Sequence, residues 1–369
     1  MALPWHKEFS VRIYEYSSAS LKSPNNRAIG VGAPNRALNF SFFRLTVAVA
    51  KSVLIRSPTS VDLLKEVRAA LYMLDATVDV ENIALRAVPS FRRKYRDFSQ
   101  TARTGELAQG ASFVFAQEVL GYPLVLDFVG FLRSQGIPAM PSGLKEPDFA
   151  LLFKDAHLRP CLLKSKGSCP PKKTNAVKSK LREALEQCTT GEAHLAACAA
   201  SVAAKNTYGT LLRLAETTDA WPSVFAYADP PGKGRNDMPY PQDAARRYYA
   251  AFFAMLGHRL LAASLMRTQP DRTLFENRPT REFGGRLYFA FSAGPGSPFA
   301  AVRRFKREPF RSESWFMQRE LLLALVDEDA TKLIEILGSF SDIRLESSDT
   351  VVTFKDGTIY AMPETVRLS

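Results

Sequence analysis

Cysteine and histidine are scarce in this chain, and their scarcity excludes several kinds of chemistry. Four cysteines occur in 369 residues, at positions 161, 169, 188 and 198, and they form no CxxC pair. Together with the four histidines they match no common zinc-ligand spacing, so a zinc site is not expected. Sparse, unpaired cysteines predict a reducing compartment and no disulfides. Because the histidines lie in unrelated sequence contexts, no Ser/His/Asp arrangement can be assembled from them.

Long apolar runs are also missing. The first 12 residues hold no hydrophobic stretch typical of a secretory signal. Charged residues interrupt the most apolar segments, Arg44 and Lys51 in one and Glu118 and Asp127 in another, so none is long enough to span a membrane. The sequence therefore predicts a cytoplasmic protein with no membrane segment. Its 46% hydrophobic and 23% charged residues are typical of a globular fold, and its length favours two domains or one elaborated domain.

Acidic residues are in deficit, and the net charge is +12. Residues 1–104 hold 16 Lys and Arg against 8 Asp and Glu, residues 154–182 hold nine against one, and a third basic cluster lies within 303–311. One such cluster is as often a solvated face as a binding surface, but three of the same sign favour a polyanionic partner, most commonly nucleic acid. The expected phosphate contacts are Lys164, Lys172, Lys173, Lys178, Lys180 and Arg182.

The stretch from residue 147 to residue 168 is where chemistry is most expected. Two apolar runs, 149–153 and 158–163, flank a polar connection, a pattern that predicts a β-hairpin. Asp148 begins the first strand, and Lys164 and Lys166 end the second. Antiparallel pairing would bring the acid and the lysines together at one end of a sheet.

Helices and further strands are expected around this hairpin. The apolar spacing and the positions of glycine and proline predict helices over Gly105–Gly121, from Pro123 to near Gly136, over Asn175–Cys188, over Glu192–Ala204 and over Gln242–Met266. A short buried strand is expected at Val224–Tyr227, and a hairpin at Val351–Tyr360 with Asp356 and Gly357 in its turn.

The order helix, β-hairpin, helix, strand resembles the core of the PD-(D/E)xK, or restriction-endonuclease-like, nuclease superfamily. Pro147-Asp148 is similar to the PD pair of that superfamily, and the run from Lys164 to Ser168 is similar to its (D/E)-x-K-G-S strand. The resemblance covers about a third of the chain and implies an α/β, nuclease-like core at 105–235. The sequence patterns place a basic, mixed α/β region at 1–104 before it, up to a polar break at 99–105, and a helical extension with a C-terminal β-hairpin at 236–369 after it.

The resemblance also implies an activity, which is metal-dependent hydrolysis of phosphodiester bonds in double-stranded DNA, in restriction or phage defence. Asp148 would bind Mg²⁺ or Mn²⁺, and Lys166 would stabilise the developing charge. The chain departs from the family where the second acid belongs, because Lys164 stands there. A lysine ~4 Å from a metal repels each unit of its charge by ~4 kcal/mol at an effective dielectric constant of about 20. Glu118 is the first replacement acid that the sequence offers, as a catalytic residue and metal ligand, and Glu146 is the second.

Several alternatives stay open at this level. Pro147-Asp148 can be an ordinary turn that enters a strand, and the lysines can be solvated. The chain can have the nuclease fold and bind DNA without cleaving it, or it can be a basic scaffold that binds other proteins. A homodimer is compatible with the sequence. Gln187 is either a substrate contact or a polar helix residue, and Phe91, Tyr95 and Phe98, interleaved with arginines, either stack on bases or form a basic connector.

Overall fold

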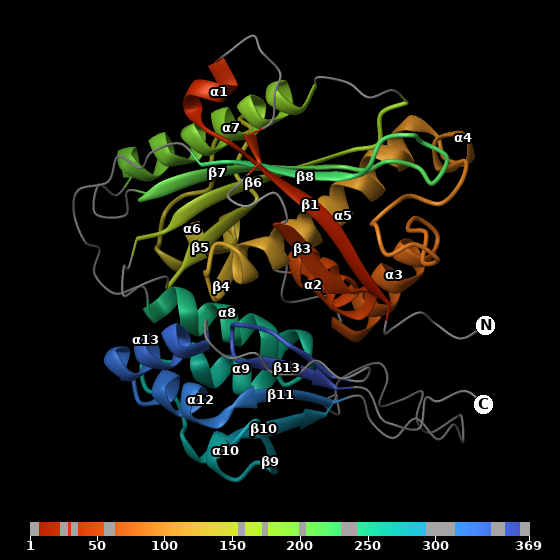
Figure 1. Cartoon of the computed structure of the whole chain (residues 1–369). Coiled ribbons are helices and arrows are strands. Elements are labelled where there is room, and N and C mark those ends of the chain that lie inside the picture. Colours follow the sequence, from red (N-terminus) through yellow and green to blue (C-terminus); the bar gives the residue numbers. More distant parts are fainter. Residues whose placement is uncertain are drawn as a thin grey trace, which may run out of the picture.

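The structure is a computed structural model, and two sheets organise it (Figure 1). It describes residues 7–22, 29–30, 36–54, 63–153, 159–171, 176–198, 204–229, 242–292, 314–340 and 351–361. The larger sheet has eight strands in the order β2-β1-β8-β7-β6-β5-β4, with β3 paired to β1 beside this path, and the smaller has five in the order β12-β13-β11-β10-β9. The chain is therefore mixed α/β, as the sequence predicts.

The hairpin expected around Asp148 lies inside the larger sheet. Strands β5 (Phe149–Leu152) and β6 (Cys161–Ser168) pair antiparallel, with Phe149 opposite Leu163. Both strands are apolar and buried where they pair, and Cys161 is fully buried among them. This prediction is confirmed, and β6 continues through the whole Lys164–Ser168 run. The residues of the polar connection at 154–158 lie outside the described part of the chain.

Two strands that the sequence patterns did not indicate flank this hairpin. β4 (Leu124–Asp127) pairs antiparallel with β5, where a helix from Pro123 was expected; the helix α6 (Phe128–Ser134) begins only after Asp127 caps it. β7 (Asn206–Arg213) pairs in parallel with β6, so the predicted strand at 224–227, which is β8 (Val224–Ala228), is the next neighbour out.

Helices cover both faces of the hairpin strands, as Figure 1 shows. α7 (Ala176–Cys198) packs on β6 and β7 from one side, and α5 (Asp97–Glu118) packs on them from the other. α7 is continuous through 189–191, where the sequence analysis places a break between helices at Asn175–Cys188 and Glu192–Ala204. α5 begins eight residues before the predicted start at Gly105, so the boundary expected at residue 104 lies within this helix.

The N-terminal residues add three strands to the larger sheet and a helix that packs on α5. β1 (Glu8–Tyr16) pairs in parallel with β8 and antiparallel with β2 (Ile29–Gly30) and β3 (Ala37–Ser41). α2 (Phe42–Leu54) packs on α5 and on α3 (Leu63–Asp75). Short helices α1 (Ser18–Lys22) and α4 (Phe91–Lys94) lie at opposite ends of the sheet in Figure 1. The capping residues expected at Thr59 and Asp62 lie outside the described residues.

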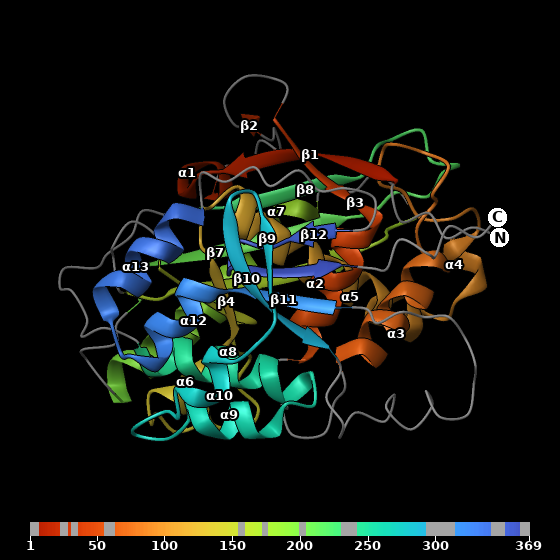
Figure 2. The same cartoon turned by 90° about the horizontal axis from the view of Figure 1, so that it is seen from below.

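The C-terminal part contains an antiparallel sheet, where mainly helices were expected (Figure 2). Its strands are β9 (Thr280–Phe283), β10 (Arg286–Ser292), β11 (Ser314–Gln318), β12 (Val351–Thr353) and β13 (Thr358–Ala361). Its helices are α8 (Gln242–Met255), α9 (Arg259–Leu265), α10 (Thr273–Glu276), α12 (Arg319–Val326) and α13 (Ala330–Ser339). The C-terminal hairpin β12–β13 is confirmed, whereas the long helix expected at 242–266 is broken at Gly257, whose φ is +81°. No helix among the described residues is both long and apolar enough to cross a bilayer.

Candidate functional site

Asp148 lies directly before β5, and its carboxylate is held against β6. Its Oδ1 accepts from Lys164 Nζ at 2.8 Å, and its Oδ2 accepts from the amide and the hydroxyl of Ser165, each at 2.8 Å. The residue is only 4% exposed, so these three donors replace the water that a free carboxylate would bind. The antiparallel register therefore brings the acid and the lysine together, as the sequence predicts.

Lys166 makes a second acid–lysine pair, with a residue of α7. Its Nζ lies 2.9 Å from Glu183 Oε1, and the same oxygen accepts from Gln187 Nε2 at 3.3 Å. Lys145 lies 3.4 Å from Oε1, and Lys180 lies 3.7 Å from Oε2. The hydrogen bond from Lys166, with the charges of Lys166 and Lys180, lowers the pKa of Glu183 to about 2, although burial opposes this shift. Glu183 is therefore ionised at neutral pH.

The alternation of side chains along β6 explains why both lysines serve one site. Residues two apart point to the same face of a strand, so Lys164 and Lys166 share the face that α7 covers. Gly209, opposite Lys164 on β7, confirms which face this is, because a Cβ on it would meet the Leu181 carbonyl oxygen of α7 at 3.1 Å.

Gly167 points to the other face of β6, towards α5. A Cβ at this position would lie 2.0 Å from the carbonyl oxygen of Thr104. The glycine of the Lys-Gly-Ser run thus has a packing role, since it lets the α5 backbone approach the strand closely.

A pocket of about 540 Å³ opens beside the two lysines. Its walls are the loop 140–146 together with Lys164, Lys166 and Gln187. The loop contributes Lys145 and Glu146, so the wall carries three cations and one acid. The ammonium groups on this wall can donate hydrogen bonds to a small anionic group, for example a phosphate.

The other predicted site residues divide into three groups. Glu118, at the end of α5, pairs with Arg44 at 2.5 Å and lies 3.9 Å from Lys355, so the structure engages it away from Asp148. Lys178 is buried, with 4% exposed, where a surface position was expected, whereas Arg182 is exposed and Lys180 is partly exposed on α7. Lys172 and Lys173, and the basic cluster at 303–311, lie outside the described residues.

Sequence reasoning missed Glu183 and gave Gln187 too little weight. Gln187, which the sequence leaves open between a substrate contact and a polar helix residue, is 4% exposed and lines the pocket. A signal for both existed, because positions four apart on a helix share a face and α7 directly follows the strand that carries Lys166. The sequence does not show how α7 is rotated about its axis, and therefore not which of its faces packs against β6.

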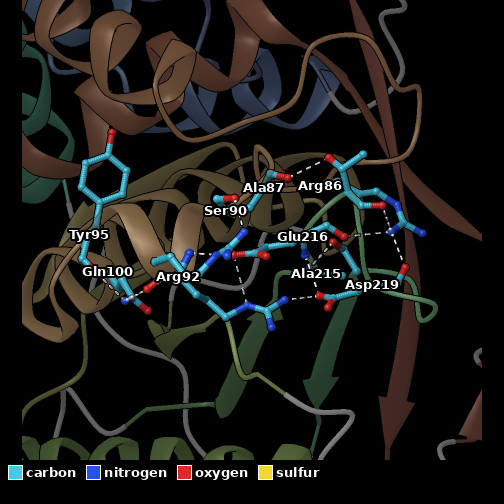
Figure 3. Close-up of polar contacts among 12 residues, drawn as sticks. Arg86, Ala87, Ser90, Arg92, Tyr95, Gln100, Ala215, Glu216 and Asp219 are labelled. Carbon is cyan, nitrogen blue, oxygen red and sulfur yellow. Dashed lines mark hydrogen bonds and ion pairs between the residues drawn. The ribbon is translucent and has the colours of Figure 1, made fainter.

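A second polar cluster lies at the Ser168 end of the sheet (Figure 3). Arg92 of α4 pairs with Glu216 at 3.4 Å and with Asp219, both in the connection between β7 and β8. Arg86 donates to the carbonyl oxygens of Glu216 and Asp219, at 3.0 and 2.9 Å. Burial is the main cause that raises the pKa of nearby Cys169, to about 11, so this thiol stays protonated at neutral pH. The cluster holds α4 against the connection between β7 and β8, and both of its acids, Glu216 and Asp219, pair with Arg92.

Comparisons with known proteins found no match to this chain among protein-family models, curated proteins or solved structures.

Proposed function

We propose that this chain binds DNA through a restriction-endonuclease-like core, and that the pocket beside Lys164 and Lys166 holds a backbone phosphate. The observation that carries the proposal is the pairing of Asp148 with Lys164 and of Glu183 with Lys166 beside a pocket with a mainly cationic wall. Each acid fixes the direction of one ammonium group, which prepares the site for an anion. The net charge of +12 supplies attraction that does not depend on base sequence.

The order of elements supports the nuclease-like core. α5, the β5–β6 hairpin, α7 and β7 follow one another along the chain and pack together around β6. This is the order helix, hairpin, helix, strand that the resemblance implies, with β7 in place of the strand at 224–227. The site lies on the hairpin, at the positions similar to the superfamily motif.

The acids of the site do not fit a divalent cation as they are arranged. Asp148 Oδ2 accepts two hydrogen bonds and Oδ1 faces an ammonium group, while Oε1 of Glu183 faces Lys166 and Gln187. Among the described residues, no three His, Cys, Asp or Glu side chains group in a way that could hold a metal ion. Binding without cleavage is therefore the function that this geometry supports best.

Binding to a fluorescent DNA duplex, followed by anisotropy at several salt concentrations, tests the proposal. Lys166→Met is expected to weaken binding and to reduce the slope of log affinity against log salt by about 0.9, the value for one lost phosphate contact. Lys166→Arg keeps the charge and should retain most of the affinity. Lys332→Met is the matched control, because Lys332 is an exposed lysine on α13. If the wild type shows no binding at low salt, the proposal is wrong.

Hydrolysis of DNA with Mg²⁺ or Mn²⁺ is the second candidate function, and the position of Glu183 favours it. This acid lies against Lys166, the residue similar to the catalytic lysine, and supplies a carboxylate that Glu118 does not. A plasmid-nicking assay separates the two functions. Metal-dependent nicking that is lost in both Asp148→Asn and Glu183→Gln would establish hydrolysis, whereas an inert wild type that binds DNA would support binding alone.

Lys164→Glu is the informative variant if the wild type is inert. It replaces the cation beside Asp148 with an acid and removes a repulsion of ~4 kcal/mol for each unit of metal charge at ~4 Å. We expect Mn²⁺ binding to appear in this variant, measured by electron paramagnetic resonance, and not in Arg182→Glu. Arg182 is exposed on α7, so that control makes the same charge change outside the pocket.

A further inference from the structure

Phe98, in the first turn of α5, is 85% exposed. The two aromatic residues closest to it in sequence are packed into the fold: Phe91 is fully buried, and Tyr95 lies 5.3 Å from it, ring centroid to ring centroid. A phenyl ring left in water forgoes the burial that drives folding. Phe98 is the most exposed large hydrophobic side chain among the described residues, so its ring is accessible to a ligand.

Cations lie close to Phe98 in the sequence. Arg93 and Lys94 are exposed at the end of α4 and Arg96 is exposed just before α5, and none of them forms an ion pair with an acid among the described residues. Arg93 instead donates to the Ser90 hydroxyl at 3.0 Å. Asp97 is the one acid of the segment 93–98, so the segment keeps a net charge of +2. An aromatic ring among unpaired cations is complementary to a base flanked by phosphates.

The segment that presents the ring is held firmly. Arg92 pairs with Glu216 and Asp219, and Gln100 Nε2 donates to the carbonyl oxygens of Arg92 and Tyr95 at 2.8 and 2.6 Å (Figure 3). The guanidinium of Arg103 lies 4.3 Å from the centre of the Tyr95 ring. We call this segment, residues 92–100, the platform. Because it is rigid, it loses little conformational entropy when a ligand stacks on it.

The platform lies at the end of β6 that carries Lys166. Thr104 packs against Gly167, the residue after Lys166, and Phe98 lies six positions before Thr104 in α5, or about 9 Å along the helix axis. Because Gly167 faces α5 and Lys166 faces α7, a nucleic acid that contacts both Phe98 and Lys166 has to pass around this end of β6.

We infer that Phe98 stacks on an unpaired nucleobase while Arg93, Lys94 and Arg96 bind the adjoining phosphates. The inference rests on the proposed function and names the form of nucleic acid that this part of the surface takes: a single strand, or a single-stranded stretch beside a duplex. Stacking on an aromatic side chain tolerates any base, so no sequence preference is expected from this contact.

Two oligonucleotides with the same number of phosphates test the inference: a thymidine 20-mer and an abasic 20-mer. Phe98→Leu is expected to bind the thymidine oligonucleotide about 5-fold or more weakly than the wild type, and to bind the abasic one equally well. Arg96→Gln should weaken binding to both, because it removes a phosphate contact. A uridine 20-mer shows whether the sugar matters.

Fluorescence provides a second readout on the folded full-length chain. In Phe98→Trp, the thymidine oligonucleotide is expected to quench the added tryptophan and the abasic oligonucleotide is not. Ile83→Trp is the matched control, since Ile83 is 69% exposed and follows Glu81 and Asn82 in place of cations. If the wild type binds the duplex but Phe98→Leu binds the thymidine oligonucleotide with the affinity of the wild type, this inference is wrong and the proposed function stands. If the wild type binds no nucleic acid, the proposed function fails with it.

Discussion

Each lysine of the site is bonded to an acid, and this pairing fixes where its ammonium group lies. Lys164 and Lys166 have side chains that are each 16% exposed, so neither is fully solvated and neither is lost in the core. An ammonium group in this position is held in place by its acid and still reaches the pocket. Free lysines on a surface would have to lose more side-chain entropy on meeting a phosphate.

Glu183→Gln is expected to alter how stability depends on pH. The folded-state pKa of Glu183, about 2, lies below its ordinary value of 4.5. The ionised carboxylate therefore stabilises the fold above pH 4.5, and this contribution disappears as the pH falls from 4.5 towards 2. Because the side chain is 34% exposed, solvent screening limits the effect at neutral pH to about 1 kcal/mol or less.

Urea unfolding at pH 7 and at pH 3 measures this contribution. The gap in unfolding free energy between wild type and Glu183→Gln should be larger at pH 7 than at pH 3. Glu186→Gln, at an exposed position on the same helix, is the control and should show no such change. An equal gap at both pH values would contradict the pairing of Glu183 with Lys166.

The meeting of Asp148 with Lys164 could be predicted from sequence, because antiparallel pairing of two neighbouring apolar runs brings the start of the first and the end of the second together. The pairing of Lys166 with Glu183 could not. It depends on the packing of α7 against β6, and Glu183 lies 17 positions after Lys166 with a break in the pattern at Pro170 and Pro171. Local periodicity states which residues share a helix face but not which strand that face meets.

Among the elements, α5 and β6 have the tightest contact that the site depends on. Gly167→Ala would place a Cβ 2.0 Å from the Thr104 carbonyl oxygen and 2.3 Å from its carbonyl carbon. Backbone atoms cannot rotate away, so α5 must shift, and we expect a loss of stability of about 3 kcal/mol or more. Thermal unfolding measures the loss, and binding to DNA should weaken because Lys166 is the neighbouring residue.

Gly105→Ala is the matched control for this prediction. Gly105 follows Thr104 in α5, and a Cβ there meets nothing within 4 Å. An alanine inside a helix is favoured over glycine, so this variant should be more stable than the wild type by about 1 kcal/mol. Destabilisation by both variants would show that the helix, and not the contact with β6, is the sensitive feature.

The elements that sequence reasoning missed have a common physical cause. β4 is four residues long and fully buried, and its Leu-Val-Leu-Asp run between Pro123 and Phe128 is too short to separate a strand from a helix by periodicity. β7 begins with polar residues, Asn206 and Thr207, and becomes buried only from Tyr208. A strand inside a sheet is defined by its two neighbours, and its own sequence carries only part of that information.

At the scale of the whole molecule, a buried ion pair joins α2, which packs beside the larger sheet, to the smaller sheet. Lys51 of α2 reaches Asp356, in the turn between β12 and β13, at 2.5 Å, and the two residues are 2% and 0% exposed. Asp356 also accepts from Tyr248 of α8 and from Thr358, and the Lys51 ammonium lies 4.3 Å from the centre of the Phe354 ring. Segments some 300 positions apart are thus fixed through one buried cluster.

Lys51→Met is expected to destabilise the protein by about 3–5 kcal/mol, because it leaves the charge of Asp356 buried without its cation. Lys51→Met with Asp356→Asn removes both charges and keeps the oxygen that accepts from Thr358, so the double variant should be more stable than Lys51→Met alone. Guanidinium unfolding followed by fluorescence measures all three proteins in a background with Trp5 and Trp221 replaced by Phe, so that Trp315 is the reporter. Trp315 is buried in the smaller sheet, and its ring centroid lies 5.3 Å from that of Phe252. If the pair joins the sheets, the wild type unfolds in a single transition and Lys51→Met exposes Trp315 before the larger sheet is lost. A cost below about 1 kcal/mol for Lys51→Met would mean that apolar packing alone holds the two sheets together.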